Sequence, residues 1–143
     1  MSKIVFVAIF LCITHSSWAQ TPTEEKIAAW PSKKNLLLID TLMTVSGFEN
    51  YFVFYCEKKI EIDASINKWD STEIQRRKSK ISFADFKDFT IYNSFAVMST
   101  KDLHQFITFC RNSENPKTIP SWILDNYPQI RNNLPLFVTR YLE

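Results

Sequence analysis

One short segment of this 143-residue chain carries both a histidine and a cysteine, the two residue types whose chemistry is easiest to recognise. The segment is "STKDLHQFITFC", and it contains His104 and Cys110. A cysteine nucleophile needs an exposed thiolate with a base in hydrogen-bonding reach. On a helix, six residues at about 100° each place the two side chains about 120° apart around the axis. We therefore interpret Cys110 as a core residue and His104 as a surface residue.

Metal ligands do not occur at recognisable spacings. Zinc requires three or four His, Cys or carboxylate ligands, and the motifs CxxC, HxxxH and HExxH are all absent from the sequence. A calcium loop needs a run of oxygen ligands around a glycine, which "DASINKWDSTE" lacks. The sequence therefore predicts no metal and no cofactor.

Two carboxylates, Glu57 and Glu61, are four residues apart and share a helix face, as the acidic pair of a glycosidase would. Lys58 and Lys59 accompany them, which is more typical of a solvated charged face. A carboxylate-based enzyme is therefore the weakest of the functional hypotheses.

The basic run of residues 76–80 is the sharpest charge feature, with four cations in five residues: Arg76, Arg77, Lys78 and Lys80. Such a run can contact anionic lipid headgroups, cell-wall polymer or a nucleic acid backbone. It contains no aromatic residue on which a base could stack. We favour a solvated loop and keep an anionic contact as the alternative.

The first 19 residues resemble a signal peptide. Lys3 provides a positive start, an apolar run covers Ile4 to Ile13, and small residues at Ser17 and Ala19 suit cleavage before Gln20. An apolar run of this length is shorter than the roughly 20 residues that span a bilayer, and no later segment is long and apolar enough. We expect an exported protein, periplasmic in a Gram-negative bacterium and secreted otherwise.

The charge and composition of the mature chain favour one helical domain. Without Lys3, 16 of the 17 basic residues remain against 15 acidic residues, a balance that argues against nucleic acid or anionic membrane as the main partner. Gly47 is the only glycine, which disfavours turn-rich β folds and glycine-lined phosphate loops.

Two cysteines, Cys56 and Cys110, remain after signal removal, in a compartment where disulfides persist. A bridge between them would stabilise the fold by roughly 4 kcal/mol in the chain-entropy model. The alternative is a pair of buried thiols that pack as small apolar residues.

Apolar spacing predicts the helices. After a polar lead over residues 20–32, in which Trp30 docks on the domain, we expect a helix over 33–45 that ends at Gly47. A long helix follows over 48–69, and residues 70–80 form a connection with at most a turn of helix. The core stripe predicted for the 48–69 helix comprises Phe48, Phe52, Tyr55, Ile62, Ile66 and Trp69, and it is widened by Cys56 and Ile60.

Two serine caps mark the next helices, because Ser82 and Ser99 are each followed by an aspartate at the third position. The chain beyond Pro120 is expected to form two or three short helices or one kinked helix. The sequence as a whole predicts an all-α protein, a small bundle of about five or six helices in a single domain over 33–143. Trp122 and Tyr127 are the aromatic residues we expect at a partner surface.

The segment "IYNSFAVMSTKDLHQFITFCRNSENPKTIPSWILDNYPQI" resembles the bacterial exported proteins catalogued as a domain of unknown function, number two thousand and fifty-nine in that series. The similar features are an aromatic helix, a Ser/Thr cap with a following acid, a Ser-rich break and a proline that opens the last helix. The family's Ser-Pro-x-Gly reads Ser113-Glu-Asn-Pro here, without the glycine. The resemblance implies an all-helical exported domain and carries over no catalytic residue.

These observations favour a non-catalytic binding or accessory protein of the cell envelope, which acts on a protein or another envelope component. The first alternative is an inhibitor or immunity protein against an exported toxin or hydrolase. The second is the carboxylate-based enzyme.

Overall fold

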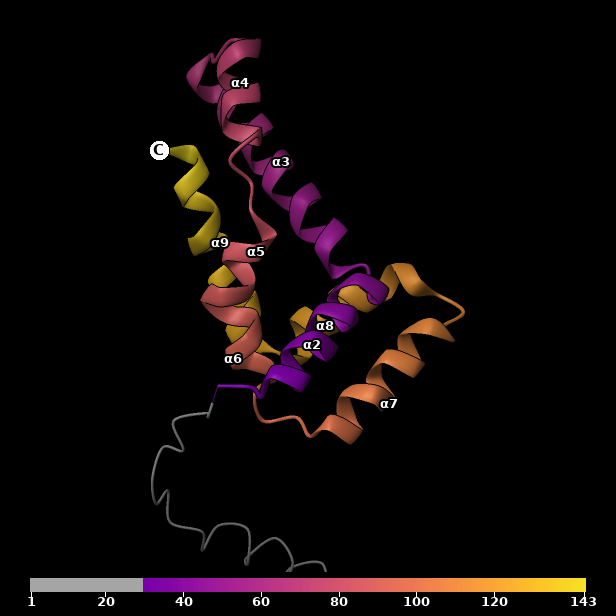
Figure 1. The fold of residues 1–143 in the computed structure, drawn as a ribbon. Coiled ribbons are helices and arrows are strands. Elements are labelled where there is room, and N and C mark those ends of the chain that lie inside the picture. Colours follow the sequence, from indigo (N-terminus) through magenta and orange to yellow (C-terminus); the bar gives the residue numbers. More distant parts are fainter. Residues whose placement is uncertain (1–29) are drawn as a thin grey trace, which may run out of the picture.

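The computed structural model describes residues 30–143, so the predicted signal peptide and residues 20–29 of the lead lie outside the described residues (Figure 1). All regular structure in 30–143 is helical, as predicted. The elements are α2 (Lys33–Val45), α3 (Phe48–Asn67), α4 (Ser71–Lys78), α5 (Phe83–Phe86), the π-helix η1 (Lys87–Ile91), α6 (Tyr92–Phe95), α7 (Thr100–Arg111), the 3₁₀ turn η2 (Pro116–Thr118), α8 (Ile119–Asn126) and α9 (Pro128–Leu142).

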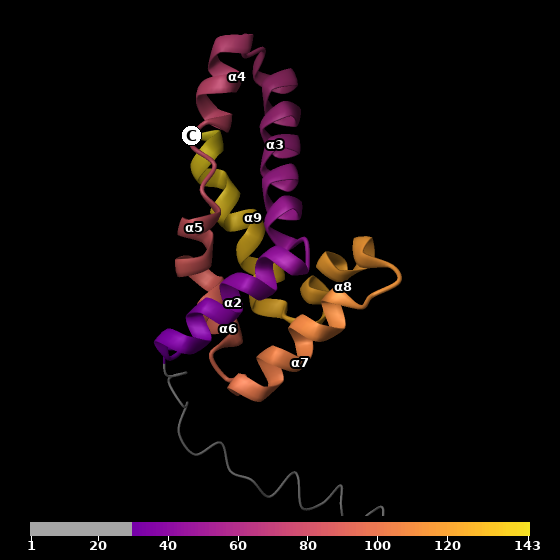
Figure 2. The ribbon, with the colours of Figure 1, turned by 45° about the vertical axis from the view of Figure 1, so that its right-hand side comes forward.

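The helices form an elongated bundle with a wider base. α3 runs beside α9 and contacts α5, and α4 covers the far end of α3. α2, α7 and α8 form the base, where α6 lies against α2 (Figures 1 and 2). α5, η1 and α6 follow one another without a break, as do η2 and α8, so the described chain has seven helical segments. The number of helical segments exceeds the predicted five or six because residues 71–78, predicted to be part of a connection, form the separate helix α4.

The junction between α2 and α3 depends on Gly47, as the sequence predicted. Its φ of 73° lies in the left-handed region, where a glycine meets no steric penalty. Ser46 before it is buried, and its hydroxyl accepts a hydrogen bond from the backbone N–H of Phe48 at 3.3 Å. The chain can therefore turn tightly from one helix into the next.

The core stripe of α3 differs from the predicted one. Ile62 and Ile66 are 53% and 71% exposed, so their predicted place in the core is wrong. The residues that α3 buries are spaced four apart: Phe48, Phe52, Cys56, Ile60 and Ala64. A stripe at this spacing drifts slowly around the helix, and it follows the line along which α5, α9 and α4 pack.

The connection expected over residues 70–80 is largely helical. Asp70 caps α4 by accepting a hydrogen bond from the Glu73 backbone N–H at 2.8 Å. Arg77 is only 7% exposed. Its Nε donates to Glu73 at 2.7 Å, its Nη1 donates to the carbonyl oxygen of Tyr141 at 2.9 Å, and its guanidinium lies 3.7 Å above the ring of Trp69. We call Trp69, Glu73, Arg77 and Tyr141 the Arg77 clamp, since they join α4 to the end of α9.

Only one of the two predicted serine caps forms a full capping box. At Ser99, the Asp102 N–H donates to the serine hydroxyl at 3.1 Å and the Ser99 N–H donates back to the carboxylate at 3.3 Å. At Ser82, the hydroxyl caps the N–H of Asp85, but the Ser82 N–H donates to the Tyr141 hydroxyl at 3.1 Å instead. The Ser82 cap is thus completed by Tyr141, which lies 59 positions further along the chain.

The π-helix η1 is a feature that the sequence analysis missed. A wider turn changes the phase of the side chains. Thr90 and Ile91 are buried, whereas Phe89 is partly exposed. The Thr90 hydroxyl accepts a hydrogen bond from the Asn133 side chain of α9 at 2.9 Å. The π-helix therefore places the buried hydroxyl of Thr90 where a side chain of α9 can form a hydrogen bond with it.

The C-terminal part forms several helices rather than one kinked helix, one of the two predicted outcomes. α8 begins beside Pro120, and Pro128 occupies the first turn of α9, where its missing N–H costs no hydrogen bond. Pro135 lies inside α9 on an exposed side of the helix.

We expect Arg77→Ala to lower the free energy of unfolding by about 3 kcal/mol, because it removes a buried cation from three partners at once. The matched control is Arg76→Ala, which also removes an arginine paired with Glu73 but on the exposed side of α4. Chemical denaturation of both variants checks the difference. Equal losses would show that Arg77 acts only as a surface ion pair.

The pKa of Glu73 is lowered from 4.5 to about 2, mainly because Arg76 donates hydrogen bonds to the carboxylate. Burial opposes this shift, and the hydrogen bond from Arg77 adds to it. A carboxyl group whose pKa is lower in the folded than in the unfolded state stabilises the fold at pH values above its unfolded-state pKa. This stabilisation is lost as the pH falls toward the folded-state pKa. We expect wild-type protein to lose stability between about pH 4.5 and 2 more steeply than Glu73→Gln. Parallel stability curves for the two proteins would contradict this expectation.

Candidate interaction surface

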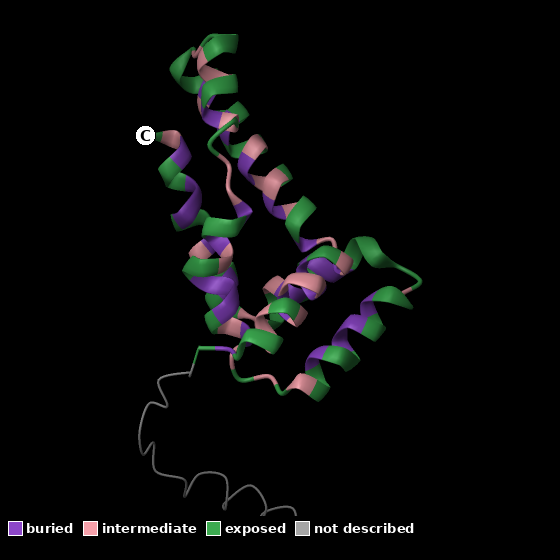
Figure 3. Ribbon diagram, viewed as in Figure 1, coloured by how far each residue is buried: buried purple, intermediate pink, exposed green. Residues whose placement is uncertain are grey.

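α7 is the helix on which the sequence analysis placed its candidate chemistry, and the structure confirms its inner face. The capping box sets its start at Thr100, and its buried residues are Leu103, Phe106, Ile107 and Cys110. This face packs mainly against α2 at the base of the bundle (Figure 2). The outer side of α7 is exposed, as the alternation of burial along the ribbon shows (Figure 3).

His104 and Cys110 lie apart, as predicted from their spacing. His104 is exposed, whereas Cys110 is buried and its thiol pKa is raised by burial. A buried thiol with a raised pKa carries little thiolate at neutral pH. The segment therefore does not form a nucleophile–base pair.

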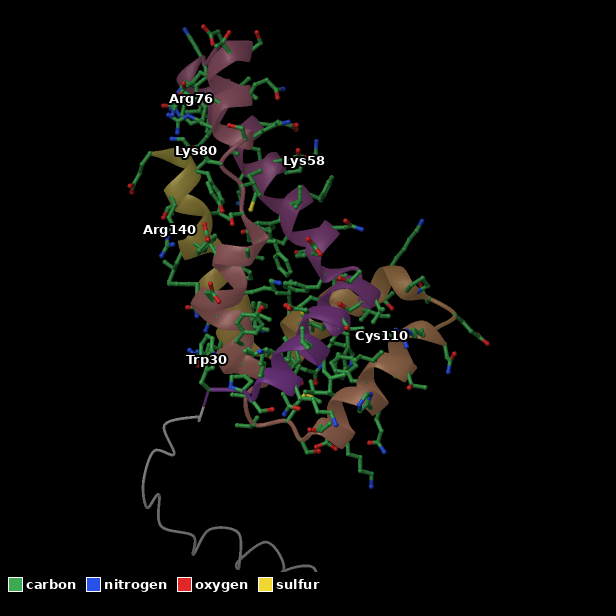
Figure 4. All side chains as sticks on the ribbon, viewed as in Figure 1. Trp30, Lys58, Arg76, Lys80, Cys110 and Arg140 are labelled. Carbon is green, nitrogen blue, oxygen red and sulfur yellow. The ribbon has the colours of Figure 1, made fainter. Side chains whose placement is uncertain are left out.

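Cys56 and Cys110 are both free and buried, so the structure shows the buried thiols rather than the disulfide. Cys110 lies at the base on α7 (Figure 4), which packs on α2. Cys56 lies midway along α3, on the line of residues that faces the core. Burial, followed by the neighbouring Glu57, raises the pKa of Cys56 to about 12. Each thiol therefore acts as a small apolar residue on its own helix.

The basic run does not present four free cations. Arg76 pairs with Glu73 at 2.6 Å, Lys78 pairs with Glu61 at 2.8 Å, and Arg77 is held in the clamp. Within residues 30–143, Lys80 is the one member of the run without an ion pair; Arg76 and Lys80 lie near the α4 end of the bundle (Figure 4). The predicted solvated loop is thus wrong for Arg77, and an anionic contact by all four residues has no support.

The pair Glu57 and Glu61 does not resemble a catalytic acid–base pair. Glu61 accepts hydrogen bonds from Lys58 and Lys78, which lower its pKa to about 2. A general acid requires a carboxyl group whose pKa is raised by burial or by a second carboxylate. In the described residues, both carboxyl groups with a resolved pKa shift, Glu61 and Glu73, are shifted the other way.

A polar cluster at the start of the described chain was missed by the sequence analysis. One oxygen of Asp40 on α2 accepts hydrogen bonds from Lys87 at 2.6 Å and from the Tyr92 hydroxyl at 2.7 Å. The ring of Trp30 then packs edge-on against Tyr92 at 5.6 Å (Figure 4), which confirms the predicted docking of Trp30. No local pattern signals this cluster, because Asp40 lies about 50 residues from its partners.

Exposed aromatic side chains gather where α7 meets α8. Trp122 of α8 is 46% exposed and packs edge-on against Phe106 at 5.3 Å. Phe109, one turn further along α7, is 59% exposed and lies 6.4 Å from the same ring. We call Phe106, Phe109 and Trp122 the α7–α8 aromatic surface.

Tyr127, the second predicted contact residue, is only partly exposed and turns toward the core. Its ring lies 4.5 Å from that of Phe95, and its hydroxyl donates to the sulfur of Met98 at 3.5 Å. Trp122 therefore shares its surface with Phe109, which the sequence analysis did not single out. The signal for Phe109 was its position outside the buried stripe of α7.

Residues 30–143 contain neither of two further kinds of site. No helix there combines the length and the hydropathy needed to cross a membrane. No group of three or more His, Cys, Asp or Glu side chains in that range is arranged to hold a metal ion.

Comparisons with protein-family models, with curated proteins and with solved structures found no match. The resemblance to the exported family of unknown function stays a prediction.

We expect Cys56 and Cys110 to react slowly with a thiol reagent in the folded protein, because both sulfur atoms are buried. After unfolding in denaturant without any reductant, both should react fully. The measurement is the number of thiols labelled before and after unfolding. Thiols that appear only after reduction would establish the disulfide instead.

Proposed function

We propose that this protein is a non-catalytic binding or accessory protein of the cell envelope that recognises a protein partner through the α7–α8 aromatic surface. The observation that carries the proposal is the pair of exposed rings, Trp122 and Phe109, which both neighbour the buried ring of Phe106.

Exposed aromatic residues of this kind are characteristic of protein interfaces. Tryptophan is enriched among the residues that dominate binding energy, and aromatic residues in general are enriched at interface cores. Phe106 is buried and contacts both exposed rings, which restricts their motion before a partner binds. Less conformational entropy is then lost on association.

The elements below the surface are well anchored. α7 begins at a full capping box and buries its inner stripe against α2. α8 buries Ile119, Pro120 and Ile123. A binding surface on two helices, each anchored to the core, keeps its geometry better than one on a loop.

The location in the envelope rests on the sequence alone, through the signal-like residues 1–19. An inhibitor or immunity protein would use the same surface against an exported toxin or hydrolase. The carboxylate-based enzyme gains no supporting observation, since the shifted carboxyl groups of residues 30–143 have lowered pKa values.

The test is quantitative capture of envelope proteins by wild-type protein and by Trp122→Ala. A central tryptophan contributes about 2 kcal/mol or more to an interface, so the variant should hold its partner about thirty-fold less tightly. Leu136→Ala is the matched control, because Leu136 is an exposed apolar residue on α9 outside the surface. Circular dichroism checks that both variants remain folded.

A partner retained equally by wild-type protein and Trp122→Ala would contradict this assignment. A partner lost equally with Leu136→Ala would also do so, because the effect would then be one of general surface hydrophobicity.

A further inference from the structure

Among the described helices of eight residues or more, α4 alone buries no apolar side chain. Its one buried residue is Arg77, which is charged. Each of the other such helices buries at least three apolar residues. Because apolar burial is the main favourable contribution to folding, α4 is held less firmly than its neighbours.

The segment that contains α4 lies between two non-helical junctions. At one end, Lys68 has a φ of 57°, a left-handed conformation that is unfavourable for a residue with a side chain. At the other end, residues 79–82 form no regular helix before α5 begins (Figure 1). We call residues 69–81 the α4 flap. The two junctions allow the flap to move while α3 and α5 keep their places.

The apolar contacts of the α4 flap are only partial. Trp69, Ile74 and Ile81 pack against the core, but all three side chains are half-buried. The free energy that keeps the flap in place must therefore come in large part from polar contacts.

The basic run supplies these polar contacts. Arg77 donates to the carbonyl oxygen of Tyr141 at 2.9 Å. This carbonyl lies at the C-terminal end of α9, where backbone oxygens lack a partner within the helix and the helix dipole favours a cation. Lys78 pairs with Glu61 of α3 at 2.8 Å. Hydrogen bonding to Glu61 raises the pKa of Lys78, burial opposes this shift, and the charges of Glu61 and Glu57 add to it.

The other two cations of the run do not tie the α4 flap to the bundle. Arg76 pairs with Glu73 inside α4, and Lys80 makes no ion pair within residues 30–143. Of the ion pairs in that range, only the one between Lys78 and Glu61 joins the flap to another element. The basic run thus has an intramolecular role through two of its four members.

We propose that the α4 flap opens and closes as one unit while the rest of the bundle stays folded, with Arg77 and Lys78 as the contacts that keep it closed. A segment with few buried apolar contacts opens at a lower free energy than the whole protein unfolds. Opening exposes Trp69, Ile74 and the last carbonyl groups of α9.

The ionic strength of the solution regulates this opening. The side chains of Lys78 and Glu61 are both partly exposed, so salt screens their attraction and favours the open state. The flap lies at the opposite end of the bundle from α7 and α8 (Figures 1 and 2). Its opening is therefore independent of the α7–α8 aromatic surface.

Amide hydrogen exchange of the full chain, resolved by residue with NMR, tests the proposal. After correction for intrinsic rates, amides of residues 74–82 should exchange at least about tenfold faster than those of Cys56 and Ile60 in the middle of α3. Low concentrations of denaturant should accelerate exchange in α3 but not in the flap, because opening the flap exposes little surface.

The amide of Ser82 separates opening of the flap from fraying of α4 alone. It lies outside α4 and donates to the Tyr141 hydroxyl at 3.1 Å. If the flap moves as one unit, Ser82 should have the same opening free energy as the amides of α4.

Lys78→Gln should accelerate exchange of the α4 amides about three-fold, as the loss of one partly exposed ion pair does. Added salt should have the same effect on the wild type and little effect on this variant. Lys80→Gln is the matched control, because it removes a lysine of the same run that makes no ion pair within residues 30–143. It should exchange like the wild type.

Three results would overturn the proposal. The first is exchange of residues 74–82 at the rate and with the denaturant dependence of the middle of α3. The second is an opening free energy at Ser82 that differs from that of α4, and the third is an equal effect of Lys78→Gln and Lys80→Gln.

Discussion

The structure depends on the contact of three phenylalanine rings from three helices. Phe52 of α3 stacks on Phe86 of α5 at 4.8 Å, and Phe137 of α9 packs against both rings, at 6.1 and 5.1 Å. All three side chains are at most 1% exposed. Because this contact sets the rotation of α3, the residues at four-residue intervals from Phe52 face inward. The opposite stripe, with Ile62 and Ile66, must then face outward.

Polar contacts between distant residues close the two ends of the bundle around this aromatic centre. The Arg77 clamp joins α4 to the end of α9, and the Asp40 cluster joins α2 to η1 and α6. Each satisfies partly buried polar groups, which would otherwise cost stability. The rings therefore determine how the helices pack, and the polar clusters determine where the first and last parts of the described chain attach. The aromatic surface of α7 and α8 lies away from both clusters and remains available for binding.

The sequence predicted what depends on local pattern. The helical class, the break at Gly47, the capping box at Ser99 and the inner stripe of α7 all follow from residues within a few positions of one another. It did not predict what depends on distant partners, such as the Tyr141 hydroxyl that completes the cap at Ser82, or the burial of Arg77. The prediction of which residues α3 buries was wrong for a related reason. That helix has two apolar stripes of helical spacing, and only its neighbours decide which one enters the core. For the candidate surface, exposure of Trp122 was predicted, whereas its nearness to Phe109 depends on the contact between the Trp122 and Phe106 rings of two different helices.

The most direct test is the free energy of unfolding of Ile60→Ala compared with Ile62→Ala, the same substitution on the two stripes of α3. Ile60 is fully buried and Ile62 is about half exposed. Ile60→Ala should lose about 2 to 5 kcal/mol, as buried isoleucines do, and Ile62→Ala should lose no more than about 0.5 kcal/mol. An equal or larger loss at Ile62 would show that the other stripe of α3 faces the core.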